Sequence, residues 1–230
     1  MRNDKSIVEE YIYNQIKSAI LTGKIPRKMQ LNEEQLAEAF EVSRTPIRSV
    51  LKKLAYEKIV KSIPFKGSFV NLPEKKEIEE TFHLRTLLET DAIKYACQNS
   101  SKEELDALEE FTKQEEQSYK DNKYDEGIQM TANFHHGLVC LTQNKVVEEI
   151  NLDLINRSTI YLAYHDEDRE SPSCPQDHRE ILQAIRDKNQ PEAIRLCLLH
   201  FENIKTHLGL TNQAEIDDFS SIFKPMKTSN

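Results

Sequence analysis

Residues 31–70 contain the pattern that most constrains how this chain can fold. Two short amphipathic helical segments are separated by a tight turn, and two β-prone strips follow around Lys66 and Gly67. Ser43 is placed to cap the second helical segment, and Pro46 lies in its first turn, where proline is well tolerated. The buried face of that segment has helical spacing: Ile47, Val50, Leu51 and Leu54. This order of elements predicts a winged helix-turn-helix, whose second helix enters the major groove of DNA.

The predicted DNA contacts are the polar groups that this pattern leaves outward. At the start of the second helix they are Arg44, Thr45 and Arg48, and arginine can bond guanine through two parallel hydrogen bonds. In the wing, Gly67 beside Lys66 lets the backbone approach a phosphate closely. An isolated amphipathic helix pair with surface arginines is also common in proteins that do not bind DNA. The basic wing and a further amphipathic helix upstream favour DNA binding here.

Three strings in this region carry a resemblance to a known family: LNEEQLA at 31–37, VSRTPIR at 42–48 and GSFV at 67–70. They are similar to the N-terminal domain of the GntR family of bacterial transcription regulators. The resemblance implies that Arg44, Thr45 and Arg48 contact DNA from the recognition helix. It also implies that Gly67 lies at the wing tip in the minor groove. Some members carry a basic residue where this chain has Glu34, which implies that one contact is altered.

The charge distribution divides the chain into two parts. Residues 1–72 hold 13 Lys and Arg against 8 Asp and Glu, whereas the remainder holds 18 against 31. Only the first part is therefore suited to a polyanion such as DNA. Pro73 and the charged residues after it predict a linker. The expected domains are a DNA-binding domain at 1–72, a linker at 73–78, a second domain at 79–212 and a tail at 213–230.

The second domain is predicted to be an all-helical bundle, because its apolar residues recur at helical intervals and no segment alternates with a period of two. The expected helices are 77–98, 102–120, 123–142, 144–166, 175–188 and 191–208. With the three helices and small β-wing of the first domain, the fold class is mainly α. No apolar run approaches the ~18 residues of a membrane span and no secretory signal is evident, so a cytoplasmic location is expected.

Histidines in the last two predicted helices indicate a buried polar centre. We expect these helices to form an antiparallel hairpin that turns near Asn189. His178 then lies eleven residues before the turn and His200 lies eleven after it. At ~1.5 Å per residue, the two imidazoles come level with each other. Inward imidazoles need partners because unsatisfied buried polar groups are costly, and a divalent metal would supply one.

The second domain also resembles a known one, on three strings: LRTLLE at 84–89, FH at 134–135 and PEAI at 191–194. They are similar to the ligand-binding helical domain of FadR-type GntR regulators, often called FCD. In metal-binding members one Asp and three His bind Zn or Ni, which implies His135, His178 and His200 as the ligands here. The expected Asp precedes the first His by one helical turn, and Thr131 stands there instead.

Two interpretations of these histidines stay open. Three neutral imidazoles can hold Zn without the Asp, which leaves positions for water or for a ligand carboxylate. Alternatively, the histidines hydrogen-bond to one another, to water and to nearby Tyr or Glu groups in a polar cavity. His136, the neighbour of His135, is expected at the surface rather than among the ligands.

Arg85 is the predicted effector contact. It lies four residues before Glu89 on the same helix face. The resemblance implies that it points into the cavity, where it can clamp a carboxylate with two hydrogen bonds. The alternative is an ordinary ion pair with Glu89 on an exposed face.

These patterns together predict a homodimeric regulator that binds an inverted-repeat operator in double-stranded DNA and acts as a repressor relieved by a small carboxylate effector. Two alternatives stay open: a metal-dependent hydrolase attached to a DNA-binding head, and an architectural DNA binder without an effector. Enzymatic activity is not expected, because hydrolysis needs a positioned general base and no segment offers one at recognisable spacing.

Overall fold

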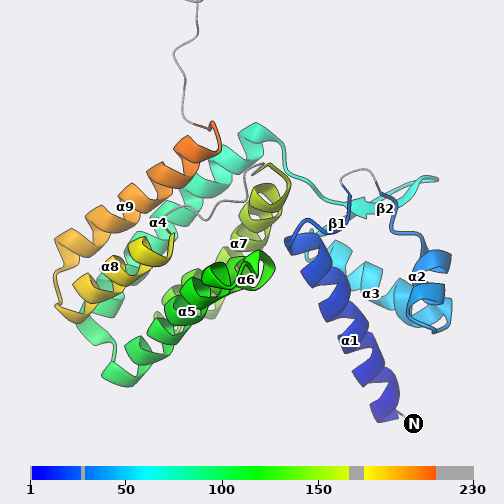
Figure 1. Ribbon diagram of the computed structural model, residues 1–230, viewed down its shortest axis with the longest axis horizontal. Coiled ribbons are helices and arrows are strands. Elements are labelled where there is room, and N and C mark those ends of the chain that lie inside the picture. The colour runs from blue at the N-terminus through cyan, green and yellow to red at the C-terminus, as the bar shows by residue number, and fades with distance from the viewer. Residues whose placement is uncertain (1, 27–28, 166–173, 211–230) are drawn as a thin grey trace, which may run out of the picture.

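The computed structural model describes residues 2–26, 29–165 and 174–210, which form a head and a body (Figure 1). The head, residues 2–72, contains α1 (Arg2–Leu21), α2 (Glu33–Ala39), α3 (Arg44–Tyr56), β1 (Val60–Ile63) and β2 (Gly67–Val70). The body, residues 75–210, contains α4 (Lys75–Asn99), α5 (Lys102–Lys120), α6 (Tyr124–Cys140), α7 (Lys145–His165), α8 (Cys174–Arg186) and α9 (Gln190–His207). The predicted fold class is confirmed. The predicted tail at 213–230 lies outside the described residues.

The head is a helix-turn-helix with a two-stranded wing. Asn32 caps α2, because its side chain accepts hydrogen bonds from the backbone N–H groups of Glu34 and Gln35. The apolar face predicted for α3 is buried and packs against α1. In the wing, β1 and β2 are antiparallel, with Val60 opposite Val70. The second strand begins at Gly67, because the ladder continues to the turn, where Ile63 pairs with Gly67.

Gly67 occupies a position at the wing tip that no other residue can fill without a shift. Its φ of +94° lies in the left-handed region, and a Cβ there would stand 2.2 Å from Nε2 of Gln30. That same nitrogen donates a 2.9 Å hydrogen bond to the carbonyl of Lys66. The tip is therefore tied to the segment before α2, and the exposed Lys66 side chain is presented from a fixed turn.

Side-chain caps mark the starts of two helices in the body. Ser101 and Glu104 form a capping box at the start of α5, and the Asn189 side chain accepts from the backbone at the start of α9. The first body helix begins at Lys75, earlier than the predicted domain start at residue 79. The charged residues placed in the linker 73–78 thus form the first turn of α4, since Glu and Lys are good helix formers.

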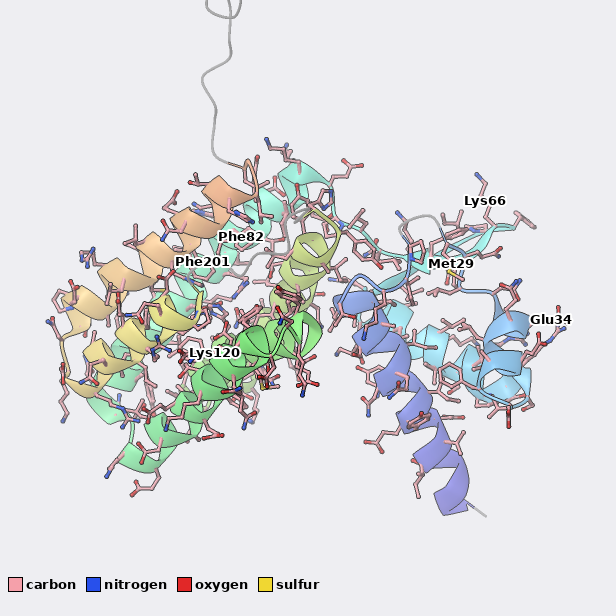
Figure 2. All side chains as sticks on the ribbon, in the orientation of Figure 1. Met29, Glu34, Lys66, Phe82, Lys120 and Phe201 are labelled. Carbon is pink, nitrogen blue, oxygen red and sulfur yellow. The ribbon has the colours of Figure 1, made fainter. Side chains whose placement is uncertain are left out.

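The core of the body contains three fully buried aromatic rings: Phe82 of α4, Phe134 of α6 and Phe201 of α9. Phe82 and Phe201 meet edge to face, with ring centroids 6.1 Å apart, between the two helices that Figure 2 shows side by side. α8 and α9 form the predicted hairpin, and α5 packs against both α6 and α8. Among the described residues, no helix is long and apolar enough to cross a membrane.

α7 belongs to the cores of both parts. Tyr161 packs in the body core, whereas its neighbour Ile160 and the nearby Tyr164 pack in the head core. The Tyr164 hydroxyl donates a 2.6 Å hydrogen bond to the carbonyl of Ile25, in the segment after α1. Figure 1 shows α7 on the side of the body that faces the head. A movement of α7 within the body would therefore change its packing contacts with the head.

Candidate DNA-binding surface and metal centre

All five predicted DNA contacts are exposed on the head. Arg44, Thr45 and Arg48 project from the start of α3, and Lys66 and Gly67 form the wing tip. Figure 2 shows Lys66 projecting from the tip at the end of the head that lies away from the body. Exposed arginines at a helix N-terminus and a basic wing supply the hydrogen-bond donors that contact with phosphates and base edges requires.

Two glutamates of α2 bond the arginines of α3. Arg48 donates to both oxygens of the Glu33 carboxylate, with Nε 3.1 Å from each oxygen and Nη2 2.8 Å from Oε2. Glu34 forms an ion pair with Arg44. The hydrogen bond from Arg48 lowers the pKa of Glu33 below its usual range. DNA that reaches these arginines must therefore compete with carboxylates of the protein itself.

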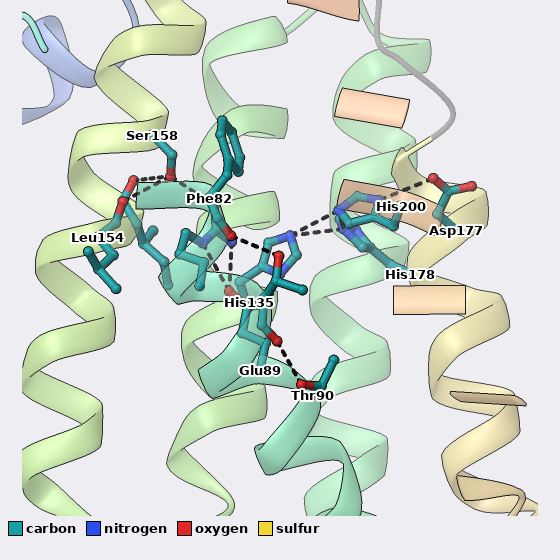
Figure 3. Close-up of polar contacts among 12 residues, drawn as sticks. Phe82, Glu89, Thr90, His135, Leu154, Ser158, Asp177, His178 and His200 are labelled. Atoms are coloured by element: carbon teal, nitrogen blue, oxygen red, sulfur yellow. Dashed lines mark hydrogen bonds and ion pairs between the residues drawn. The ribbon is translucent and has the colours of Figure 1, made fainter. Parts of the chain in front are cut away.

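Three buried histidines converge in the body (Figure 3). His135 comes from α6, His178 from α8 and His200 from α9. The Nε2 atom of His178 lies 3.2 Å from that of His135 and 3.4 Å from that of His200, and the third Nε2–Nε2 distance is 3.3 Å. The structure thus brings together the three ligands expected from the sequence. The half-buried His136 lies outside this cluster, with its Nε2 near Cys140.

Each imidazole in the cluster is held through its other nitrogen by a carboxylate. The Nδ1 atom of His135 lies 2.6 Å from Glu89, that of His178 lies 2.8 Å from Glu115, and that of His200 lies 3.1 Å from Asp177. A carboxylate at Nδ1 fixes the tautomer in which Nδ1 carries the proton. All three Nε2 atoms then point lone pairs at one centre, where the protein supplies acceptors and no donor.

This donor set fits a divalent metal. Burial lowers the pKa of His135 well below its usual value and also lowers the pKa of His200, so both imidazoles are neutral, as metal ligands must be. For a metal ~2.05 Å from each nitrogen, tetrahedral geometry places the nitrogens about 3.3 Å apart, and an octahedral face places them about 2.9 Å apart. The observed separations of 3.2–3.4 Å match the tetrahedral value.

Thr131, which replaces the expected Asp, contacts a carboxylate from another helix. Its Oγ1 donates a 2.5 Å hydrogen bond to Oε1 of Glu115, and the other oxygen of Glu115 meets His178. Glu115 is a residue of this site that was not predicted from the sequence. The one signal for Glu115 in the sequence is its spacing. It falls at helical intervals from the residues that form the buried face of α5, namely Leu105, Leu108 and Thr112.

Arg85 is buried, with 4% of its side chain exposed, so the alternative of an ion pair on an exposed face is wrong. Nε donates to Oε1 of Glu89 at 3.0 Å, and Nη1 donates to the Ser158 hydroxyl of α7 at 2.8 Å. Nη2 lies 2.9 Å from the same Glu89 oxygen but makes no hydrogen bond to any described residue. This buried nitrogen is a donor available to a ligand.

The fold and these sites define a class of protein, which comparison with known families confirms. The model of bacterial regulatory proteins of the gntR family matches residues 9–70, and the FCD domain model matches residues 80–203. The chain belongs to the GntR family of transcriptional regulators, with an FCD domain as its body. It is a regulator and not an enzyme, so the hydrolase alternative is wrong.

Several relatives extend along most of the chain. The helix-turn-helix transcriptional regulator YdhC of Bacillus subtilis is 30% identical over 85% of this chain and 88% of its own length. The gluconate operon transcriptional repressor of Bacillus licheniformis is 27% identical over 83% of this chain and 81% of its own. Among solved structures, a GntR regulator from Rhodococcus sp. RHA1 has a TM-score of 0.78 at 18% identity, covering 89% of this chain and 99% of its own.

Proposed function

We propose that this chain is a cytoplasmic, homodimeric repressor that binds an inverted repeat and is released by a small carboxylate. The observation that carries the proposal is the pairing, in one molecule, of an exposed recognition helix with a buried three-histidine centre linked to the head through α7. Two copies of the head would place two recognition helices on the half-sites of one operator. The repressor role is supported by the relatives named as gluconate operon repressors.

Selection from a random-sequence duplex library tests the DNA-binding part. The purified protein should enrich an inverted repeat whose half-sites are about one helical turn apart. Arg48→Ala should weaken binding to the selected site by about 5- to 100-fold, the cost of one lost bidentate base contact. Enrichment of no motif by the full-length protein would contradict operator recognition and would favour the architectural alternative.

For the sensor, we propose that His135, His178 and His200 hold Zn²⁺ or Ni²⁺ and that the effector carboxylate meets both the metal and Nη2 of Arg85. When bound, such a metal supplies a Lewis-acidic position for a carboxylate oxygen. Arg85 supplies a buried cationic donor beside it, already oriented by Glu89 and Ser158. Burial makes this pair selective for an anion, because Nη2, which lies 2.9 Å from Glu89 without a hydrogen bond to a described residue, would gain one when an anion binds.

Calorimetric titration of zinc-loaded protein with short carboxylic and sugar acids tests the effector class. A binding acid should lose affinity by about 10-fold or more in Arg85→Lys, which keeps the charge but lacks the forked geometry. Alanine is unsuitable because it would leave the buried Glu89 without its ion-pair partner, at about 3–5 kcal/mol of stability. Equal affinity in Arg85→Lys would remove this side chain from the effector site.

Coupling between sensor and head is proposed to run through α7. Glu89 bonds both His135 and Arg85, and Arg85 bonds Ser158 of α7. Two residues after Ser158, α7 enters the core of the head through Ile160. A ligand that shifts Arg85 would therefore bias the position of α7 against the head, which is how differential affinity for two states changes DNA binding.

The test compares DNA affinity with and without zinc and effector. Couplings of this kind typically change affinity by about 5- to 150-fold. Ser158→Ala should reduce that ratio to near one while the zinc affinity stays unchanged. Thr81→Val is the matched control, because its buried hydroxyl bonds only the backbone of α4. An undiminished ratio in Ser158→Ala would show that coupling bypasses this contact.

A further inference from the structure

We propose that Thr131 and Glu115 together replace a carboxylate metal ligand in this chain. In this arrangement Glu115 orients His178 and does not bond the metal, so the three-histidine centre keeps its fourth position for an exogenous anion. The inference rests on the proposed metal binding and assigns a role to two residues of helices α5 and α6. It also states what kind of ligand completes the centre.

Both oxygens of the Glu115 carboxylate already contact polar groups of the protein. Oε1 accepts the Thr131 hydroxyl at 2.5 Å, and Oε2 lies 2.8 Å from Nδ1 of His178. Glu115 is fully buried, so its carboxylate is closed off from bulk solvent. Reaching the metal would require Glu115 to release His178 and leave that Nδ1 proton unpaired, which is costly in a buried site. Glu115 therefore acts as a positioning residue.

An Asp at position 131 could not take the place of Thr131 without bringing its carboxylate against that of Glu115. Thr131 lies one helical turn before His135, and its hydroxyl oxygen is 2.5 Å from Glu115. Two carboxylate oxygens this close would repel each other. Threonine instead donates a hydrogen bond to Glu115. The Glu115 carboxylate therefore lies behind the imidazole of His178 and not among the atoms that would ligate a metal.

The three-histidine centre leaves the fourth ligand position of a tetrahedral metal open. The Nε2 separations of 3.2–3.4 Å fit three corners of a tetrahedron around Zn²⁺. With no carboxylate among the residues that would hold it, a bound Zn²⁺ would keep its full positive charge and would have its fourth position open. An anionic oxygen ligand is the class that such a position favours. Arg85 bonds Glu89, which in turn bonds Nδ1 of His135, so this chain also holds a buried cation next to the cluster.

Zinc affinity, measured by competition with a chromophoric chelator, tests the role of the pair. Glu115→Gln keeps the shape but removes the charge, and it should weaken zinc binding by about 10- to 100-fold. Thr131→Val removes only the hydroxyl and should weaken zinc binding by up to about 10-fold. Thr112→Val is the matched control, because this fully buried hydroxyl of α5 bonds only the Glu109 carbonyl. It should bind zinc like the wild type.

The Co²⁺-substituted protein reports the coordination geometry directly. The wild type should show the intense visible bands of tetrahedral Co²⁺, and added acetate should shift them by occupying the fourth position. The double swap Thr131→Asp with Glu115→Gln should instead build a centre with a carboxylate ligand, whose bands respond less to acetate. Thermal unfolding and affinity for mixed-sequence duplex DNA confirm that each variant is folded.

Each outcome is decisive. Zinc affinities of Glu115→Gln and Thr131→Val within twofold of the wild type would overturn the role of the pair. Weak, six-coordinate Co²⁺ bands in the wild type would overturn the open tetrahedral position. A wild-type protein that binds no divalent metal would overturn this inference and the metal part of the proposed function. The DNA-binding part of the proposed function would be unaffected, because operator selection tests it separately.

Discussion

At the scale of single residues, Glu34 is the departure that most affects DNA recognition. It is 70% exposed on α2, and it pairs with Arg44, one of the arginines expected to read DNA. The resemblance to the GntR family implies that some members carry a basic residue at this position. A carboxylate here repels the DNA phosphates and forms an ion pair with Arg44. It therefore weakens phosphate contacts, which do not depend on the DNA sequence, while contacts with base edges still distinguish one sequence from another.

Glu34→Gln should therefore strengthen binding to mixed-sequence duplex DNA by about 1.5- to 5-fold, the range expected for one exposed ion pair. Fluorescence anisotropy at several salt concentrations measures it. Glu38→Gln removes the same charge from the exposed surface of the same helix and serves as the matched control. Equal gains in the two variants would mean that net charge alone, and not release of Arg44, sets the affinity.

At the scale of the element, α7 is held against the head by a close backbone contact. Gly23 follows α1 with a φ of +68°, and a Cβ at this position would stand 2.6 Å from the carbonyl oxygen of Ala163 in α7. Both the conformation and the space require glycine. Gly209 offers a clean comparison, because it has a similar φ of +63° but nothing within 4 Å of a Cβ.

Gly23→Ala should lower the free energy of unfolding by about 2–5 kcal/mol, the sum of left-handed strain and overpacking against α7. Gly209→Ala should lower it by only about 1–2 kcal/mol, for the strain alone. Chemical denaturation of both variants measures the difference. Equal losses would indicate that the head and α7 separate readily and that their contact contributes little to stability.

At the scale of the whole molecule, the three-histidine centre joins helices that are distant in the chain. His135, His178 and His200 come from three helices of the body, and their carboxylate partners Glu89 and Glu115 come from two more. A metal held at this point stabilises the folded body by mass action, because the unfolded chain does not bring these ligands together.

Zinc at about 100 times its dissociation constant should therefore stabilise the protein by ~2.7 kcal/mol and raise Tm by about 5–10 °C. A strong chelator should reverse the increase in Tm. His178→Ala should abolish the zinc-dependent increase, whereas His136→Ala, which alters a neighbouring histidine outside the cluster, should retain it. A zinc-dependent increase that survives His178→Ala would place the metal elsewhere.

Much of this organisation could be predicted from local patterns. The capping box of Ser101 and Glu104 involves residues three apart, so it could be recognised without knowledge of the rest of the fold. The pairing of His178 with His200 could be predicted by counting residues on either side of the turn at Asn189. Buried spacing in α3 likewise identified the recognition helix and the exposed arginines beside it.

The contacts that complete the site could not be predicted in this way. Glu115 and His178 are 63 residues apart, and Arg85 and Ser158 are 73 apart. No local signal says which helices of a bundle become neighbours, because that choice depends on how all their apolar faces pack at once.

By itself, then, the amino-acid order determined which segments become helices, which face of α3 is apolar with its arginines exposed, and that His178 and His200 point inward at the same level. Only the tertiary structure decided that a carboxylate of α5 meets the threonine of α6 and that α7 is shared by head and body. The physical reason is distance: a hydrogen bond acts over about 3 Å, and such proximity between remote helices exists only after the core has packed.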